Sequence, residues 1–304
     1  MTSSTPSSPL RRWFSSLRPY SVIPSLIPPL AAVGIARSME PEVLRWAFPV
    51  YLAATVLLHF GANVLNDYYD YRHGVDHEGT VDTDHVLVAG VVTPRFMLLS
   101  GHLYFVSAVL LGLLIGAVRG PAFVLVGLCA VTAAYFYTGE RFSFKYVAVG
   151  ELVVFLLAGP GLIGLAVWVL AGAVPPVVIP VSLPIASLAA AILHGNNMRD
   201  RRTDRAAGVR TLANSLSQSH ALGVLALLLL LPYPALVIMI VSGVAHFLTA
   251  FAVLSLPAAL RILRRTAQAR DERELRLLPR SCALLYGAFS LPYAAAILLT
   301  GVRL

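Results

Sequence analysis

The sequence is poor in charge, because Asp, Glu, Lys and Arg make up only 12% of its 304 residues. Soluble domains carry about 25% charged and 45–50% apolar residues, whereas this chain is 58% hydrophobic with a mean hydropathy of +0.77. Cysteine is nearly absent, and Cys129 and Cys282 lie in apolar runs without metal-ligand spacing. We interpret both as ordinary core residues. The composition therefore indicates a membrane protein and argues against a soluble domain.

Long apolar runs recur along the chain, each close to the roughly 20 residues that cross a bilayer as a helix. We count nine such runs, at about 17–38, 43–69, 95–118, 120–138, 147–171, 176–198, 220–240, 243–263 and 282–301. Backbone groups in hydrocarbon must be paired within their own segment, so these runs are predicted to be helices. We expect no cleavable signal peptide at the start. The prediction is an all-α membrane protein with a disordered cytoplasmic tail (1–16) and one transmembrane domain (17–304).

Basic residues are distributed asymmetrically about these runs. With nine spans and a cytoplasmic N-terminus, 19 of the 23 Lys and Arg residues fall on the cytoplasmic side. Short loops rich in Lys and Arg stay in the cytoplasm. We therefore predict a multi-pass protein of the cell (inner or plasma) membrane, with its N-terminus and polar loops cytoplasmic. The net charge of +8 reflects this topology and contact with anionic headgroups, and we expect no nucleic-acid partner.

Two sets of polar residues stand at the ends of the second and sixth runs. Each contains one Asn and two Asp at helical spacing, and the sets are Asn63, Asp67, Asp70 and Asn197, Asp200, Asp204. Residues three, four and seven positions apart share one helix face. The first Asp of each set is separated by 133 residues and the second by 134. This matched spacing indicates two related halves.

Carboxylates at helix C-termini are unfavourable, because a helix end already carries about half a negative charge. Two such ends facing each other would need a cation between them. Oxygen ligands of Asp and Asn suit Mg²⁺, which keeps several waters and also binds substrate phosphates. The alternative is that these are ordinary solvated charges at helix ends. The arginines around the second set serve topology, but one or two directed inward would complete a diphosphate site.

Further motifs accompany the two sets. The sequence reads N-D-Y-Y-D at 66–70, D-R-R-T-D at 200–204 and G-V-R-T-L-A at 208–213, with Arg18-Pro19 near the first run and Y-T-G-E-R-F-S-F-K-Y at 137–146. On these residues the chain resembles the UbiA superfamily of membrane prenyltransferases over nearly its whole length. Within the superfamily, the extended motifs are most similar to the 1,4-dihydroxy-2-naphthoate prenyltransferases of menaquinone synthesis.

The resemblance implies nine transmembrane helices in two pseudo-repeated halves around a central cavity that opens to lipid. It also implies Mg²⁺ as cofactor, with an isoprenyl diphosphate and an aromatic acceptor as substrates. The metal ligands would be Asn63, Asp67, Asp70, Asn197, Asp200 and Asp204, and the four aspartates would be catalytic. Substrate-binding candidates are Lys145 and Arg210 at the diphosphate, together with Asn66, Asp76, Tyr137 and Arg199. Gly74 stands where many members have a further Asp, which Asp76 could replace, and His85 stands where an arginine is expected.

Other polar residues lie within the apolar runs. Glu151 is costly to bury and is either functional or paired with Lys145 or an arginine. His194 could face the cavity, but we expect it to make an interhelical hydrogen bond. The lone histidines at 59, 102 and 246 are interpreted as structural.

Three other functions compete with a naphthoate prenyltransferase. A transporter would also have related halves and intramembrane acids, but its binding groups lie near the bilayer midplane, whereas here the acids gather at the ends of the runs. A membrane scaffold leaves the matched Asp sets unexplained. A related enzyme could use 4-hydroxybenzoate, homogentisate, haem, chlorophyllide or a glycerol phosphate as acceptor.

Overall fold

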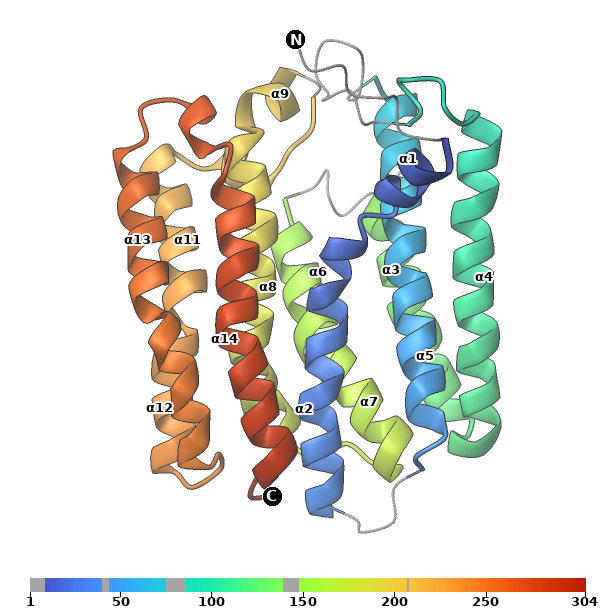
Figure 1. Ribbon diagram of the computed structural model, residues 1–304, viewed down its shortest axis with the longest axis vertical. Coiled ribbons are helices and arrows are strands. Elements are labelled where there is room, and N and C mark those ends of the chain that lie inside the picture. The colour runs from blue at the N-terminus through green and yellow to red at the C-terminus, as the bar shows by residue number, and fades with distance from the viewer. Residues whose placement is uncertain (1–8, 40–43, 75–85, 139–147, 207) are drawn as a thin grey trace.

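The computed structural model describes residues 9–39, 44–74, 86–138, 148–206 and 208–304, and all its helices and turns of helix within these ranges form one bundle (Figure 1). Seven of the described helices are long and apolar enough to cross a membrane. They are Ala47–Arg72, Pro94–Arg119, Gly150–Ala171, Val178–Arg199, Gln218–Val241, Phe247–Gln268 and Arg273–Thr300. The two other expected spans are shorter apolar helices, Ile23–Met39 and Pro121–Tyr137. A count of nine spans is therefore not established by length and composition.

Six of the nine apolar runs form single α-helices. These are α2 (Ile23–Met39), α3 (Ala47–Arg72), α4 (Pro94–Arg119), α5 (Pro121–Thr138), α8 (Val178–Arg199) and α14 (Leu278–Thr300). The other three runs are composite: α6 (Gly150–Leu156), η3 (Leu157–Gly161) and α7 (Leu162–Ala171); α11 (Gln218–Leu230) and α12 (Pro232–Val241); and η4 (Phe247–Ser255) and α13 (Leu256–Gln268). Short elements complete the chain: α1 (Pro9–Ser16), η1 (Pro19–Val22), α9 (Arg201–Ala206), α10 (Leu212–Ser215) and η5 (Glu272–Leu275).

Proline accounts for two of the composite runs, because it lacks a backbone donor and its ring disturbs the preceding turn. Pro160 lies within η3, a wider π-helical turn between α6 and α7. Pro232 is the first residue of α12 and separates it from α11. These prolines change the helix without ending the run, because neighbouring helices can satisfy the backbone groups that a proline frees.

The helices pack around α8, α14 and α2, which lie in the middle of the bundle in Figure 1. In α8, 72% of the span is buried, against 22–50% in the other six spans. Helices α2 and α14 pack closely, since a Cβ atom added to Gly34 would lie 2.1 Å from the backbone oxygen of Ile297. A smaller apolar cluster, which includes Leu65, Met97 and Phe105, joins α3 to α4.

Two surface segments differ from expectation. Residues 9–16 were expected to be disordered but form α1, because Trp13 packs edge-on against Phe96 of α4 with ring centroids 5.0 Å apart. The basic stretch 261–280 is rich in Arg and Leu, which favour one continuous helix, but α13 ends at Gln268. Asp271 then caps η5 by accepting hydrogen bonds from two backbone amides. Local apolar packing and capping decide both segments.

Candidate active site

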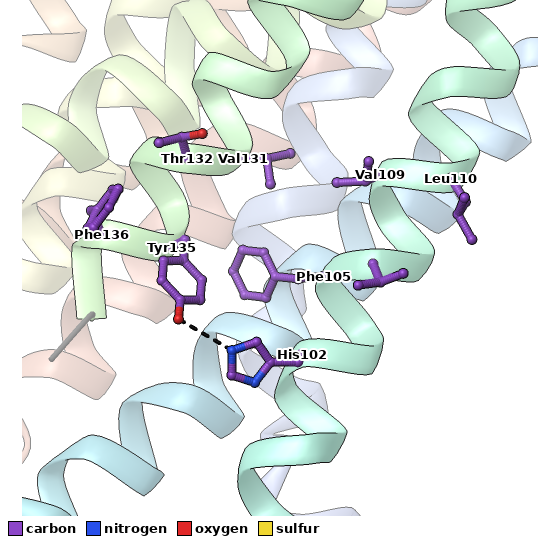
Figure 2. A pocket seen from close by; sticks show the side chains of 9 residues that line it. His102, Phe105, Val109, Leu110, Val131, Thr132, Tyr135 and Phe136 are labelled. Atoms are coloured by element: carbon purple, nitrogen blue, oxygen red, sulfur yellow. Dashed lines mark hydrogen bonds between the residues drawn. The ribbon is translucent and has the colours of Figure 1, made fainter.

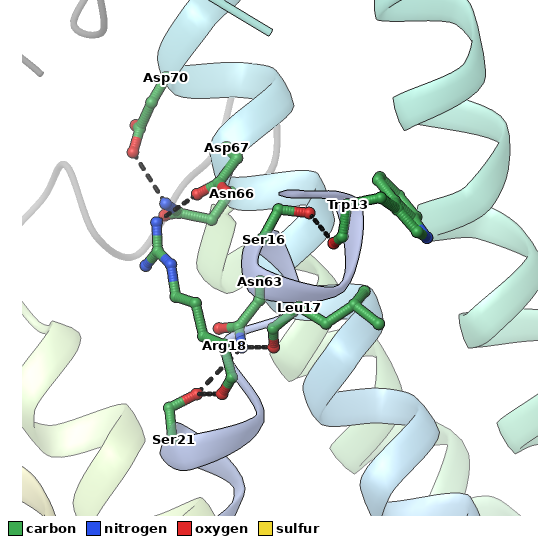
Figure 3. A network of polar contacts seen from close by, with 9 residues as sticks. All are labelled: Trp13, Ser16, Leu17, Arg18, Ser21, Asn63, Asn66, Asp67 and Asp70. Carbon is green, nitrogen blue, oxygen red and sulfur yellow. Dashed lines mark hydrogen bonds and ion pairs between the residues drawn. The ribbon is translucent and has the colours of Figure 1, made fainter. Parts of the chain in front are cut away.

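The first Asn/Asp set lies on the last turns of α3 (Figure 3), where Asp67 and Asp70 are both buried. Arg18 reaches Asp67 from the turn before η1, with Nη2 2.5 Å from Oδ1. The backbone of Arg18 is left-handed (φ 50°, ψ 57°), a conformation that costs a non-glycine residue about 1 kcal/mol or more. Asn66 donates from Nδ2 to Oδ2 of Asp70 at 2.8 Å. The predicted clustering at this helix end is thus present, with Arg18 as an added member.

Asn63 lies one helical turn before the carboxylates, and its side-chain amide is hydrogen-bonded to the segment around η1. Its Nδ2 donates to the Leu17 carbonyl at 3.1 Å and to Ser21 Oγ at 3.2 Å. Ser21 Oγ also lies 2.8 Å from Nε2 of His59, whose Nδ1 is 2.9 Å from Ser25 Oγ. The interpretation of His59 as structural fits these contacts, but they extend to a predicted metal ligand.

The second set lies where α8 ends and α9 begins. Asp200 follows the last residue of α8 with φ −97° and ψ 12°, which turns the chain. Arg199 grips Asp200 through two hydrogen bonds, Nε to Oδ1 at 2.7 Å and Nη2 to Oδ2 at 2.6 Å. Asp204 is buried on α9. The sequence predicted Arg199 at the substrate, and the structure places it on a proposed metal ligand.

A buried polar group joins α6 to α8 beside Asn197. Glu151 Oε1 accepts from Asn197 Nδ2 at 3.0 Å and lies 2.9 Å from Nδ1 of His194. His194 Nε2 in turn lies 2.9 Å from the Ala221 carbonyl on α11. The interhelical role expected for His194 is confirmed. Among the described residues Glu151 contacts a histidine and an amide, while Lys145, one of the partners we expected, lies outside them.

Tyr137, at the end of α5, lies within electrostatic range of both Glu151 and Asp70. It therefore borders the first Asn/Asp set and the polar group that supports the second. Its role as a substrate-binding residue stays a prediction. Lys145, Asp76 and His85 lie outside the described residues.

Arg210 is one of six residues that line a cavity of about 300 Å³. The other five are Arg205, Gly208, Val209, Asn214 and Ser215. The loop is fixed by a reciprocal cap, in which Thr211 Oγ1 accepts from the Asn214 amide and Asn214 Oδ1 accepts from the Thr211 amide. The Arg210 carbonyl accepts from the Ala148 amide at 3.0 Å. The segment that enters α6 therefore lies beside Arg210.

A larger groove of about 360 Å³ lies between α4 and α5, away from the carboxylates (Figure 2). Its lining is apolar apart from Thr132 and the pair His102 and Tyr135, whose side chains approach to 3.3 Å. Such a lining suits hydrocarbon and supplies no cationic side chain for a phosphate. The central cavity itself stays a prediction.

Magnesium fits the chemistry of the two sets. Within the described ranges, no three His, Cys, Asp or Glu side chains group as a complete protein-made metal site. Each set nevertheless offers two carboxylates and an amide, which suits a metal that completes its shell with water and substrate phosphate. Glu151 Oε2 is buried and has no hydrogen-bond partner among the described residues, which fits a position beside a cation-binding site.

Sequence reasoning left two contributors out of the predicted site. Arg18 was noted only as part of a motif, because nothing in its local pattern predicts contact with a residue 49 positions away. Glu151 did carry a signal, since an acidic residue inside an apolar run is a functional candidate by default. Its partner could not be read from spacing, because α6 and α8 meet only in the folded bundle.

Comparisons with known proteins give matches to one family and one fold. The family model described as "UbiA prenyltransferase family" matches residues 25–285. The chain is 32% identical over 296 residues to a "UbiA prenyltransferase domain-containing protein 1 homolog" of Drosophila melanogaster, covering 94% of the chain and 79% of that protein. A solved UbiA homolog from Archaeoglobus fulgidus bound to DMAPP and Mg²⁺ has 19% identity and a TM-score of 0.66, covering 95% of this chain and 98% of that chain. A second structure of that homolog, bound to GPP and Mg²⁺, has 18% identity and a TM-score of 0.61 over 93% of this chain and 99% of that one.

Proposed function

The chain belongs to the UbiA prenyltransferase family, and from this premise we propose that it transfers a polyprenyl group from an isoprenyl diphosphate to an aromatic acceptor with the aid of Mg²⁺. The observation that carries the proposal is the pair of matched Asn/Asp sets, at the ends of α3 and α8, with Tyr137 within range of both neighbourhoods. Complexes of the A. fulgidus homolog with DMAPP, GPP and Mg²⁺ support it.

In this proposal the two sets hold Mg²⁺ at the diphosphate, which stabilises negative charge on the leaving oxygens. Asn63, Asp67 and Asp70 form one ligand set, and Asn197, Asp200 and Asp204 form the other. Arg210 and Lys145 donate to the diphosphate, since a cationic donor favours developing charge without transferring a proton. Asn66, Asp76 and Arg199 complete the polar wall of the site.

The reaction breaks the allylic C–O bond, and its electron pair leaves with the diphosphate. A carbon of the electron-rich acceptor ring then attacks the allylic cation, and loss of a proton or of CO₂ from that carbon restores aromaticity. Aromatic faces stabilise cations by about 0.5–2 kcal/mol, and Tyr137 is the wall residue we propose for this role. The surrounding helices exclude water, which would otherwise trap the cation.

The membrane arrangement is part of the proposal. All nine apolar helical runs cross the bilayer, with the N-terminus and both Asn/Asp sets on the cytoplasmic side. The prenyl tail lies among the helices in the hydrocarbon region. Both sets stand at the same end of the bundle in Figure 1, which favours an enzyme over a transporter that binds at the midplane.

The direct test is diphosphate release by purified protein supplied with geranylgeranyl diphosphate and an acceptor. Release should require Mg²⁺ and stop when EDTA is added. Release that continues undiminished in excess EDTA would contradict the metal role, and the absence of any prenylated product would contradict the transferase.

For the acceptor we propose 1,4-dihydroxy-2-naphthoate or a close bicyclic relative, as in menaquinone synthesis. The extended motifs at 66–76 and 196–213 support this choice, because they match that subfamily beyond the shared Asp residues. A competition assay would offer the naphthoate and 4-hydroxybenzoate together with geranylgeranyl diphosphate. Preferential prenylation of 4-hydroxybenzoate would overturn the naphthoate assignment and leave the transferase intact.

A further inference from the structure

An asparagine ligand has an orientation problem that an aspartate does not have. Its side chain ends in one oxygen, which can bind a metal, and one NH₂ group, which cannot. The two ends are nearly equal in size, so neighbouring groups must decide which end faces the site. Asn63 and Asn197 are both proposed ligands. In both, a neighbouring oxygen accepts a hydrogen bond from the NH₂ group and so fixes the orientation of the amide.

In the second half, Glu151 makes the choice for Asn197. Asn197 Nδ2 donates to Glu151 Oε1 at 3.0 Å, which leaves Oδ1 as the end available to a metal. Glu151 is 6% exposed, Asn197 is 8% exposed and His194 is fully buried. Because water cannot substitute for Glu151 at this depth, loss of its oxygen would leave the amide NH₂ without a partner.

His194 fixes Glu151 in turn. The Ala221 carbonyl can only accept, so His194 Nε2 carries a hydrogen and donates to it at 2.9 Å. One further proton lies between His194 Nδ1 and Glu151 Oε1, which are 2.9 Å apart. Wherever that proton rests, Oε1 keeps a lone pair for Asn197. The support of the amide is therefore independent of the proton's position.

The first half contains the same device with a serine in place of the glutamate. Ser21 Oγ donates to the Arg18 carbonyl at 2.7 Å, so it accepts from both Asn63 Nδ2 and His59 Nε2. Ser25 then donates to His59 Nδ1 at 2.9 Å. In both halves a histidine one turn before the asparagine holds an oxygen, and that oxygen holds the amide NH₂.

We propose that His194–Glu151 and His59–Ser21 are positioning pairs that fix the amides of Asn197 and Asn63 with their Oδ1 atoms directed to the Mg²⁺–diphosphate site. The inference rests on the proposed function and adds residues that act through the ligands without touching the substrate. Asn63 has a second acceptor in the Leu17 carbonyl, whereas Glu151 is the acceptor recorded for Asn197 among the described residues. Loss of the His194–Glu151 pair should therefore weaken metal binding more than loss of the His59–Ser21 pair.

The test measures metal affinity and uses Mn²⁺ as the probe. Free Mn²⁺ is followed by electron paramagnetic resonance while full-length protein in detergent is titrated with saturating geranyl thiolodiphosphate, an unreactive substrate analogue. Glu151→Leu removes the acceptor, and Asn197→Asp offers an oxygen at both ends. Each variant is also checked by gel filtration and thermal unfolding.

With Asn197 present, Glu151→Leu should weaken Mn²⁺ binding about tenfold or more, the usual effect of losing a residue that orients a ligand. With Asn197→Asp present, the same change should cost less than about threefold, because an aspartate has no wrong end. Equal losses in the Asn and Asp backgrounds would overturn the inference.

Two further arms keep the outcomes separate. If Glu151→Leu does not fold, Ser21→Ala is measured instead, with an expected two- to threefold loss beside Asn63 and none beside Asn63→Asp. An equal loss in those two backgrounds would also overturn the inference. The unchanged protein should bind Mn²⁺, and Asp67→Asn and Asp200→Asn should each abolish that binding. If the unchanged protein does not bind Mn²⁺, or if these variants bind it equally well, the proposed function itself fails.

Discussion

The two Asn/Asp sets contain the same residue types at nearly the same spacing, yet the fold holds them differently. The first set lies on the unbroken helix α3, and its Asp67 forms an ion pair with Arg18, which is distant in the sequence. The second set straddles the break between α8 and α9, and its Asp200 is closed by the adjacent residue, Arg199. The related halves therefore reach similar chemistry by long-range and by local contacts.

Exposure follows the same division. The Asp67 side chain is 9% exposed, whereas the Asp200 side chain is 37% exposed and its arginine 36%. A buried carboxylate depends on its partner for compensation, but a solvated one does not. The difference teaches that Asp67 is built into the bundle, whereas Asp200 retains contact with solvent, although Asp70, Asn197 and Asp204 are all buried.

The largest effect should come from the carboxylates themselves. Asp67→Asn and Asp200→Asn should each lower prenyl transfer by at least about 100-fold, because each removes charge that stabilises the leaving diphosphate. Asp271→Asn is the matched control, since Asp271 is an exposed cap of η5 outside both sets. Near-normal turnover in only one of the two variants would break the functional equivalence of the halves.

A smaller effect should separate the two arginines. Arg18→Ala should lower the free energy of unfolding by about 1–3 kcal/mol, because it leaves the buried Asp67 without this charged partner. Arg199→Ala should cost less than about 1 kcal/mol, as expected for an exposed ion pair. Thermal unfolding in detergent measures both changes. Equal losses of unfolding free energy would show that the contrast between the buried Asp67 and the more exposed Asp200 does not matter for stability.

The smallest effect concerns two helix caps. Thr93 caps α4 and Thr211 caps α10, each by accepting a backbone hydrogen bond at 3.2 Å. Each change to alanine should cost about 0.5–2 kcal/mol of stability. Only Thr211→Ala should also raise the KM for the prenyl diphosphate, because Thr211 is next to Arg210. Steady-state kinetics of both variants test this, and an unchanged KM in Thr211→Ala would contradict a role for that loop.

The sequence predicted the helical runs and the members of the two sets well, for a physical reason. Hydrocarbon imposes apolar composition on whole segments, and helical periodicity puts residues three or four apart on one face, so both features are local. The contacts of Arg18 with Asp67 and of Glu151 with Asn197 depend on how helices meet. No periodic pattern encodes them, and the family likeness named ligands without naming their supports.

Some local features were also missed. Helix α1 is held by Trp13 on α4, a single aromatic contact that a polar Ser/Pro-rich stretch does not suggest. Two expected spans, Ile23–Met39 and Pro121–Tyr137, are short for crossing a bilayer, the first because its helix begins at Ile23 and not near residue 17. Prolines explain part of this, because Pro19 begins the short η1 turn before the first of these helices.

The π-helical turn at Leu157–Gly161 sets the rotational phase of the whole 150–171 run. An α-helix advances about 100° per residue, and a wide turn accommodates one residue more than a regular α-turn. Glu151 faces Asn197 above the turn, while Gly159 lies so close to α8 that an added Cβ would be 2.4 Å from Ala186 Cβ. A continuous α-helix could satisfy only one of these contacts. Deleting a single residue from this turn would therefore rotate the first part of the run by about 100° relative to the second. Glu151 would then point away from the side-chain amide of Asn197, although the run would still be long enough to cross the membrane.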